Sequence, residues 1–221
     1  MASKRFPASC YLSPPLLAFM GRRPGARLTV SKPHPRVFAF DDAPFDFEAP
    51  TTAVVGLVVS LPAYVEGVLR GEVRVDGDDA TQEVARLVRS SGSRAAAQAI
   101  LLGGISLGGF NVIDLTRLNS DTGLPVITVT RAAPDIGSME RAIRQHLPHR
   151  EDAVAMLRAH PLFTLSVRPR PLWMSAVGAT PDEARQLVKK CLVRGSFPEP
   201  LRLAHLFASA IPPGPVSRSR A

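Results

Sequence analysis

The chain has 221 residues, of which 45% are hydrophobic and 21% are charged. This length and balance favour one globular domain and exclude a wholly disordered chain, despite the 21 prolines. The longest apolar stretches are interrupted before they reach the roughly 18 residues of a membrane-spanning helix, so we expect no membrane association. Two cysteines, Cys10 and Cys191, are too few for a disulfide scaffold, which favours a reducing compartment and a cytoplasmic location.

Charge is distributed unevenly along the chain, whose formal net charge is +8. Residues 1–36 carry seven basic residues and no acid, whereas residues 37–83 carry ten acids and two arginines. Residues 84–221 carry eighteen basic residues and nine acids. An acidic segment within a basic chain is the pattern of a cation site that serves a polyanionic ligand. An ordinary mosaic of solvated surface charges is the alternative.

The first 35 residues are predicted to form a basic, proline-rich and disordered tail. Prolines interrupt every candidate helix in this segment, and no apolar period survives them. A single domain over residues 36–211 and a flexible tail over residues 212–221 complete the predicted organisation.

Three strands are predicted at the start of the domain. Residues 37–40 form a short apolar run that ends in Asp41 and Asp42. Residues 51–60 are apolar and rich in β-branched side chains, and residues 68–75 alternate apolar with polar side chains. Short links between these strands predict an antiparallel meander.

Helices and strands alternate in the rest of the domain. Further strands are expected at residues 97–102, 125–130 and 172–177, and helices from residue 79, within residues 111–118, 139–146 and 151–160, from residue 180, and over 199–210. Thr180 and Glu183 have the spacing of a capping box. Such alternation is typical of parallel βαβ units. A meander followed by these units predicts a ribonuclease H-like α/β fold with a mixed sheet flanked by helices. Acids at the ends of its first and fourth strands can share divalent metal ions.

Four segments carry recognisable motifs: residues 40–45 (FDDAPF), 75–81 (VDGDDAT), 102–114 (LGGISLGGFNVID) and 122–127 (TGLPVI). Over about residues 32–210, in order and with compatible spacing, the chain resembles a mostly archaeal uncharacterised family, catalogued as domain of unknown function ninety-nine. That family is similar to endonuclease V, a ribonuclease H-like, magnesium-dependent nuclease that cuts near deaminated adenine. Residues 194–205 (RGSFPEPLRLAH) are the part most similar to endonuclease V itself.

The resemblance implies a metal site that is incomplete in this chain. Asp41 matches the strand-one aspartate by which endonuclease V holds metal, and a carboxylate there suits Mg²⁺ or Mn²⁺. Gly103 stands where endonuclease V has a second metal-binding aspartate, and Ala179 stands where it has a histidine after Gly178. Two-metal hydrolysis needs several oxygens that converge on ions roughly 4 Å apart, so the implied cage lacks ligands.

The candidate site residues follow from the same resemblance. The catalytic candidates are Asp41 and Asp79, and the metal candidates are Asp41, Asp76, Asp79 and Asp182, with Asp78 and Asp114 as further possibilities. Arg194 and Arg202 are the candidates for contacts with nucleic-acid phosphates. Nucleic acid is the expected partner, and no nucleotide or other organic cofactor is expected, because the glycines of residues 103–109 lack the P-loop and dinucleotide-binding patterns.

Each candidate also has a purely structural interpretation. Asp41 and Asp42 are able to cap a turn, and residues 76–79 suit a strand-to-helix turn with an N-cap. The glycines of residues 103–109 either face a phosphate with their amides or allow close backbone packing. Three histidines, one cysteine and one tryptophan are assigned ordinary structural roles: His146, His149 and His160 at the surface, Cys191 as a buried thiol, and Trp173 in the core.

Three functional hypotheses remain open from the sequence. The first is a divalent-metal-dependent nuclease of the endonuclease V type. The second is a catalytically inactive nucleic-acid-binding protein on the same scaffold, with an affinity that falls steeply with salt. The third is a protein that binds a nucleotide or another small phosphorylated ligand. The missing acid at Gly103 favours binding without turnover, whereas the acids around Asp41 and Asp79 favour cleavage.

Overall fold

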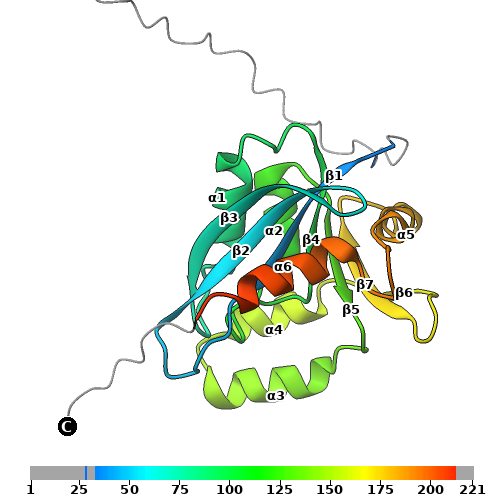
Figure 1. The fold of residues 1–221 in the computed structure, drawn as a ribbon. Coiled ribbons are helices and arrows are strands. Elements are labelled where there is room, and N and C mark those ends of the chain that lie inside the picture. The colour runs from blue at the N-terminus through cyan, green and yellow to red at the C-terminus, as the bar shows by residue number, and fades with distance from the viewer. Residues whose placement is uncertain (1–27, 29–32, 213–221) are drawn as a thin grey trace, which may run out of the picture.

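The sheet at the centre of the fold has seven strands in the order β3-β2-β1-β4-β5-β7-β6 (Figure 1). The structure is a computed structural model and describes residue 28 and residues 33–212. The strands are β1 (Arg36–Asp42), β2 (Thr51–Ser60), β3 (Tyr64–Arg74), β4 (Ala97–Leu102), β5 (Val126–Thr130), β6 (Phe163–Leu165) and β7 (Leu172–Val177). The predicted tails, residues 1–35 and 212–221, lie almost wholly outside the described residues and stay predictions.

The central strand β1 is paired on both sides. It runs antiparallel to β2, and β2 runs antiparallel to β3, which confirms the predicted meander. On its other side β1 is parallel to β4, and β4 is parallel to β5, which confirms the predicted parallel units. The last strand, β7, is antiparallel to β5, because the chain enters it through a hairpin with β6 instead of a single crossover helix. With three residues, β6 is too short for a sequence period to reveal.

Helices cover both faces of the sheet. They are α1 (Ala80–Ser90), α2 (Leu115–Thr122), α3 (Ile136–His146), α4 (Glu151–Arg158), α5 (Pro181–Lys190) and α6 (Glu199–Ser209). α5 and α6 pack on one face, and α1 and α2 pack on the other (Figure 1). Alternation along β1 separates these two cores, since Val37 and Ala39 face α6 while Phe38 and Phe40 face α1 and α2.

The predicted capping box at the start of α5 is confirmed. The Thr180 hydroxyl accepts a hydrogen bond from the Glu183 amide at 3.3 Å, and the Glu183 carboxylate accepts one from the Thr180 amide at 2.9 Å. These two bonds satisfy amide groups that the first helical turn leaves without partners, which explains why α5 begins at Pro181.

The segment between β4 and α2, residues 103–113, is here named the glycine loop. Its Gly108 amide donates to the Asp42 carboxylate at 2.7 Å, and its Phe110 amide donates to the Asp76 carboxylate at 2.7 Å. Gly108 and Gly109 have φ angles of +62° and +80°, and a Cβ on Gly109 would overlap the Asp76 carboxylate. Close packing and left-handed backbone therefore explain these two glycines, as the structural interpretation predicted.

Asn111 attaches the glycine loop to the beginning of α1. Its side chain is fully buried; its amide nitrogen donates to the Arg74 carbonyl at 3.0 Å and to the Asp79 carboxylate at 2.7 Å. Its amide oxygen accepts a hydrogen bond from the Ala80 amide at 3.0 Å. Asn111 thus caps α1 from a distant part of the chain. The residue at the N-cap position, Asp79, makes no side-chain capping bond of its own.

α3 and α4 form a hairpin with a small core of its own, separate from the two cores of the sheet. Arg150, whose side chain is 6% exposed, donates to the Gly77 carbonyl and to Asp152 at 3.0 Å, and so ties the hairpin to the turn before α1. Within the hairpin, hydrogen bonds from Arg158 hold the pKa of Glu140 below its usual value. The hairpin is therefore held by buried charged groups as well as by apolar contacts.

The structure tests the ordinary roles assigned to single residues. Cys191 is buried, as predicted, and burial raises the pKa of its thiol far above the usual value. His146 and His149 are exposed, as predicted. Trp173 is partly exposed and, with His160, lines a cavity, so its assignment to the core is wrong. Helices leave part of the β5–β7 face uncovered at this place. No helix among the described residues is long and apolar enough to cross a membrane.

Replacing Asn111 by alanine is expected to lower the free energy of unfolding by about 2–4 kcal/mol, because the buried Ala80 amide and the Asp79 carboxylate each lose a partner. Urea denaturation followed by circular dichroism measures this loss. Ser120→Ala, at an exposed position of α2, is the control and is expected to change stability by less than about 0.5 kcal/mol. Equal stabilities of the two variants would contradict the role assigned to Asn111.

Candidate active site

Asp41 lies at the end of the central strand, beside the end of β4. Phe40 is paired with Leu102 in the parallel register of β1 and β4, so Asp41 and Gly103 follow as neighbours on the two strands. Asp41 has the same orientation as Val37 and Ala39 and points to the α6 side of the sheet. This confirms that an acid ends the first strand beside the end of the fourth, where the ribonuclease H-like topology predicts a site.

His205 of α6 contacts Asp41 directly. The Nδ1 atom of His205 lies 2.8 Å from Oδ2 of Asp41, and the two residues are 164 positions apart in the chain. Packing of α6 on β1 brings them together, through Leu201 and Ala204 of the shared core. The His205 side chain is 68% exposed and that of Asp41 is 25% exposed, so the imidazole lies on the solvent side of the carboxylate.

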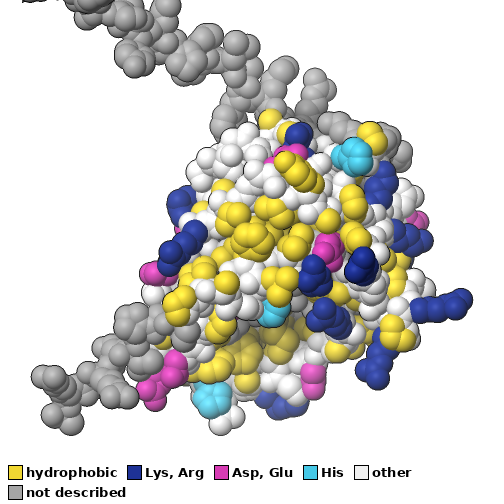
Figure 2. Space-filling view, viewed as in Figure 1, with side chains coloured by type: hydrophobic (Ala, Val, Ile, Leu, Met, Phe, Trp, Pro, Cys, Tyr) yellow, Lys and Arg dark blue, Asp and Glu magenta, His cyan; other side chains and the backbone are white. Residues whose placement is uncertain are grey.

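Two arginines and an aromatic ring complete a pocket of about 260 Å³ around Asp41. Arg131, which follows β5, places its guanidinium 4.1 Å from the centre of the Phe197 ring. Arg202 of α6 lines the same pocket and forms an ion pair with Glu199, with 2.8 Å between Nε and Oε2. Figure 2 shows Lys and Arg side chains gathered near the amino-terminal end of α6. The pocket thus places one acid among basic side chains, as a site for an anionic ligand requires.

Ionisation of Asp41 is opposed by its surroundings. Burial, and then repulsion from Asp42, raise the pKa of Asp41 from 3.8 to about 6, although the hydrogen bond with His205 acts in the opposite direction. The Asp41 carboxylate is therefore mostly ionised at neutral pH but holds its proton more tightly than an exposed aspartate does. A carboxyl group with a pKa closer to neutrality is the kind that serves in proton transfer.

The other predicted acids lie elsewhere. The Asp79 carboxylate accepts hydrogen bonds from Asn111 and Arg74, which outweigh the effect of burial and lower its pKa. Asp76 holds the glycine loop through the Phe110 amide. Asp182 has an 86% exposed side chain and is paired with Arg185 at 2.7 Å.

None of these three acids lines the pocket of Asp41. The same is true of Asp114, whose side chain caps α2 by accepting from the Arg117 amide at 2.9 Å. Asp78 forms an ion pair with Arg74. Of the two predicted phosphate contacts, Arg202 lies in the pocket, whereas Arg194 is exposed in the segment between α5 and α6.

The donor groups of the pocket do not fit a two-metal cage. No group of three or more Asp, Glu, His or Cys side chains that could hold a metal ion is found among residues 28 and 33–212. Asp42, the nearest acid in sequence, is turned to the glycine loop by its bond with Gly108. The carboxylate of Asp41 fits a single Mg²⁺ or Mn²⁺ ion, because such ions often take one or two protein carboxylates and fill their remaining positions with water and substrate phosphate.

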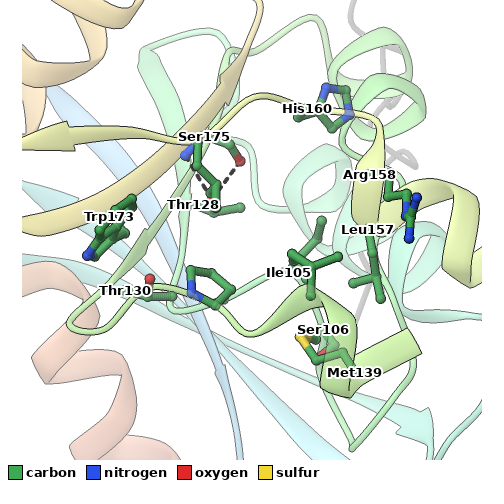
Figure 3. A pocket seen from close by; sticks show the side chains of 14 residues that line it. Ile105, Ser106, Thr128, Thr130, Met139, Leu157, Arg158, His160, Trp173 and Ser175 are labelled. Carbon is green, nitrogen blue, oxygen red and sulfur yellow. Dashed lines mark hydrogen bonds between the residues drawn. The ribbon is translucent and has the colours of Figure 1, made fainter. Parts of the chain in front are cut away.

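A second cavity, of about 390 Å³, is lined by Gly104, which follows β4, and by side chains of β5, β7 and the α3–α4 hairpin. Figure 3 shows this cavity from close by. Gly103 lines the Asp41 pocket and the next residue, Gly104, lines this larger cavity. Consecutive residues of the glycine loop thus line the two cavities. A Cβ built on either glycine meets no atom within 4 Å, so both positions are open.

Sequence reasoning missed three features of this region. His205 belongs to the segment most similar to endonuclease V but was not singled out, and Arg131 carries no local motif. Their signals are long-range, because only the packing of α6 and the end of β5 against β1 and β4 brings them to Asp41. The larger cavity arises from the incomplete cover of β5 and β7, which no sequence period encodes.

Replacing Asp41 by asparagine is expected to stabilise the ligand-free protein at pH 7.5 by about 2–3 kcal/mol, which is the free energy that corresponds to the raised pKa. The folded state binds this proton more tightly than the unfolded state does. The stability of the native protein therefore falls as the pH rises from about 4 to about 6, and the gain from the substitution is absent below pH 4.

Chemical denaturation at pH 3.5 and pH 7.5 measures the gain expected from Asp41→Asn. Asp182→Asn is the matched control and is expected to change stability by less than about 0.5 kcal/mol at either pH, because its side chain is exposed. An Asp41→Asn variant that is less stable than the native protein at pH 7.5 would show that the charge of Asp41 does not destabilise the folded protein.

Comparison with known proteins assigns the fold and the family. A UPF0215 protein of Thermococcus gammatolerans is 42% identical over 188 residues, which cover 83% of this chain and 95% of that protein. A crystal structure of a protein of unknown function from Archaeoglobus fulgidus matches with a TM-score of 0.70 and 38% identity, over 80% of this chain and 97% of that one.

Endonuclease V of Ciona intestinalis, solved in complex with DNA that contains inosine, matches with a TM-score of 0.53 and 16% identity, over 80% of this chain and 85% of that one. This similarity confirms the predicted endonuclease V-like, ribonuclease H-like fold. The sequence model of the family described as Endonuclease dU matches residues 33–212. The chain therefore belongs to the Endonuclease dU family.

Proposed function

We propose that this protein binds DNA across the ends of β1 and β4 and hydrolyses a phosphodiester bond near a deoxyuridine. The name of the family supports the reaction and the substrate, and the endonuclease V-like fold supports a nucleic-acid partner. The observation that carries the proposal is the Asp41–His205 pair, which shares one pocket with Arg131, Arg202 and the open position at Gly103.

The arginines supply the affinity for the phosphate in this proposal. Arg131 follows β5 and Arg202 lies on α6, so the two guanidinium groups approach the pocket from different elements. Neither is buried, so each is able to exchange water for a phosphate oxygen at modest desolvation cost. The ion pair with Glu199 fixes the orientation of Arg202 and leaves part of its donor fork for the substrate.

The pair formed by Asp41 and His205 handles the proton. When Nδ1 of His205 carries hydrogen, it donates to Asp41, and Nε2 is left as an acceptor on the exposed side of the ring. Nε2 then takes a proton from the attacking water, while Asp41 orients the ring and stabilises its charged form. A single Mg²⁺ or Mn²⁺ ion held by Asp41 would add neutralisation of the phosphate charge and a lower pKa of bound water.

A second candidate function is DNA binding without turnover. Gly103 is the observation that favours it, since the neighbouring strand end brings no second carboxylate to Asp41. Both functions predict binding that weakens steeply with salt, so only a measurement of cleavage separates them.

Replacing Asp41 by asparagine is expected to lower cleavage of deoxyuridine-containing DNA by at least about 100-fold and to leave DNA affinity within about threefold, because the arginines remain. The measurement uses labelled single- and double-stranded DNA and RNA that carry uracil, inosine or no lesion, in Mg²⁺, in Mn²⁺ and in EDTA. Asp182→Asn, far from the pocket, is the control and should cleave like the native protein.

The outcome of this experiment decides between the two functions. If the native protein binds DNA but cleaves none of the substrates, the nuclease hypothesis is excluded and binding without turnover is supported. Equal cleavage by the native protein and Asp41→Asn would show that the reaction takes place elsewhere in the molecule.

Introducing an acid by Gly103→Asp is expected to tighten the binding of Mn²⁺ to the DNA-free protein by at least about tenfold. The new carboxylate would lie at the strand end beside Asp41, in open space, and would give the ion a second oxygen ligand. Isothermal titration calorimetry measures this change. Ser120→Asp is the control because it also adds an acid at an exposed position, on α2 and away from the pocket. Equal affinities of the two variants would contradict the assignment of Asp41 as the metal ligand.

A further inference from the structure

The larger cavity has an apolar wall and a polar floor. Ile136 and Met139 of α3, Leu157 of α4 and Ile105 of the glycine loop form much of the wall. Its volume of about 390 Å³ is at the lower end of the range of small-molecule pockets, which suits one planar ring system better than a larger ligand. Figure 3 shows Ile105, Met139 and Leu157 on the side opposite Thr128 and Ser175.

Two hydroxyl groups form the floor. Thr128 of β5 and Ser175 of β7 are opposite each other in the register of these strands, and their side-chain oxygens are 2.8 Å apart (Figure 3). Both residues are more than nine-tenths buried, with 6% and 3% of their surfaces exposed. The Ser175 amide also donates to the Thr128 hydroxyl oxygen at 3.2 Å.

The hydroxyl pair of Thr128 and Ser175 has one hydroxyl hydrogen that is not used in a hydrogen bond. Each hydroxyl has one hydrogen to donate, and a bond between the two oxygens uses only one of them. No other acceptor for either hydroxyl is found among the described residues. A buried donor without a partner is costly, so the remaining hydrogen points to an acceptor that enters the cavity from outside.

Charge around the cavity favours an uncharged ligand. Arg158 lines the opening, but its guanidinium is engaged by both oxygens of the buried Glu140 carboxylate. His160 lines the cavity as well, and no acidic side chain does. Arg131, which has no carboxylate partner among the described residues, and Arg202 line the other pocket, with Asp41. A nucleotide is therefore expected to place its phosphate in the Asp41 pocket and its neutral base in this cavity.

Gly103 and Gly104 make this division of a nucleotide sterically reasonable. They are consecutive residues, with Cα atoms about 3.8 Å apart, and each lines one of the two openings. Neither has a side chain to separate the openings. The two cavities lie on opposite faces of the sheet, so a base turned out of the stack next to the cleaved phosphate would reach the larger cavity around the end of β4.

We infer that the hydroxyl pair of Thr128 and Ser175 is the polar floor of a nucleobase pocket and donates a hydrogen bond to a carbonyl oxygen of the bound base. The inference rests on the proposed function, because that function brings a nucleotide to the neighbouring Asp41 pocket. It adds two specificity-determining residues, which lie on strands β5 and β7 and outside the glycine loop.

The test uses Trp173, the single tryptophan of the chain, as a reporter, because its ring lines the cavity. The full-length protein is titrated in EDTA, so that no cleavage occurs, with a single-stranded oligonucleotide that carries one deoxyuridine. The same oligonucleotide with a phenyl ring in place of uracil offers a similar shape without a carbonyl group. An oligonucleotide with an abasic site at this position offers no ring.

The native protein is expected to bind the deoxyuridine oligonucleotide with a change in Trp173 fluorescence and about tenfold more tightly than the phenyl oligonucleotide, as one hydrogen bond predicts. The double variant Thr128→Val, Ser175→Ala should bind these two oligonucleotides equally. Its affinity for the abasic oligonucleotide should match that of the native protein. Thr128→Ser keeps both hydroxyl groups and should restore the tenfold preference.

Two results would overturn the inference. One is a double variant that keeps the preference for deoxyuridine over phenyl, and the other is native protein without that preference. The second result needs no variant, so the inference remains testable even where the double variant does not fold. This experiment measures binding and not cleavage. A protein that does not cleave DNA can still show the preference for deoxyuridine, and a protein without this preference can still be a nuclease.

Discussion

Parallel pairing of β1 with β4 is the constraint on which the rest of the site depends. The register that places Phe40 beside Leu102 brings Asp41 to Gly103 without any contribution from loops. The alternation of side chains then sends Asp41 and Gly103 to the α6 side and Gly104 to the opposite side. One pairing register thus determines which residues of this strand end line the Asp41 pocket and which line the larger cavity. Helix α6 adds His205 and Arg202 to an arrangement that the strands have already fixed.

The acidic segment of the chain has a structural explanation for most of its site candidates. Asp42, Asp76 and Asp79 each accept hydrogen bonds that hold the glycine loop or the turn before α1. Asp41 alone among them faces the basic pocket, and it does so with a raised pKa. The chain therefore uses neighbouring acids for two different purposes. Asp42 and Asp76 accept amide hydrogen bonds of the glycine loop, and Asp79 is bonded to Asn111 and Arg74, whereas Asp41 is bonded to the exposed His205 side chain in the pocket.

The predictable part of the molecule is the part encoded by short-range patterns. The apolar run that ends at Asp41, the β-branched run of β2 and the capping box of Thr180 each located an element correctly. The antiparallel direction of β7 was missed because it depends on a hairpin with a three-residue strand. His205 was missed for a related reason, since it reaches Asp41 across 164 residues. Asp79 was predicted as a site residue because it is an acid just before a helix. The local sequence does not distinguish an acid that binds a metal from one that is bonded to Arg74 and Asn111, as Asp79 is.

The two sides of the larger cavity differ in stiffness. Its floor belongs to β5 and β7, which are bonded within the central sheet and share that sheet's cores. Its wall belongs largely to the α3–α4 hairpin, which contributes four of the five buried apolar side chains described for its separate core, the fifth being Val112 of the glycine loop. Displacing the hairpin by a small amount costs less free energy than displacing a strand, since fewer contacts change. In the nucleobase pocket that we infer, the strands would therefore fix the position of the hydrogen bond, and the hairpin would adjust to the outline of the ring.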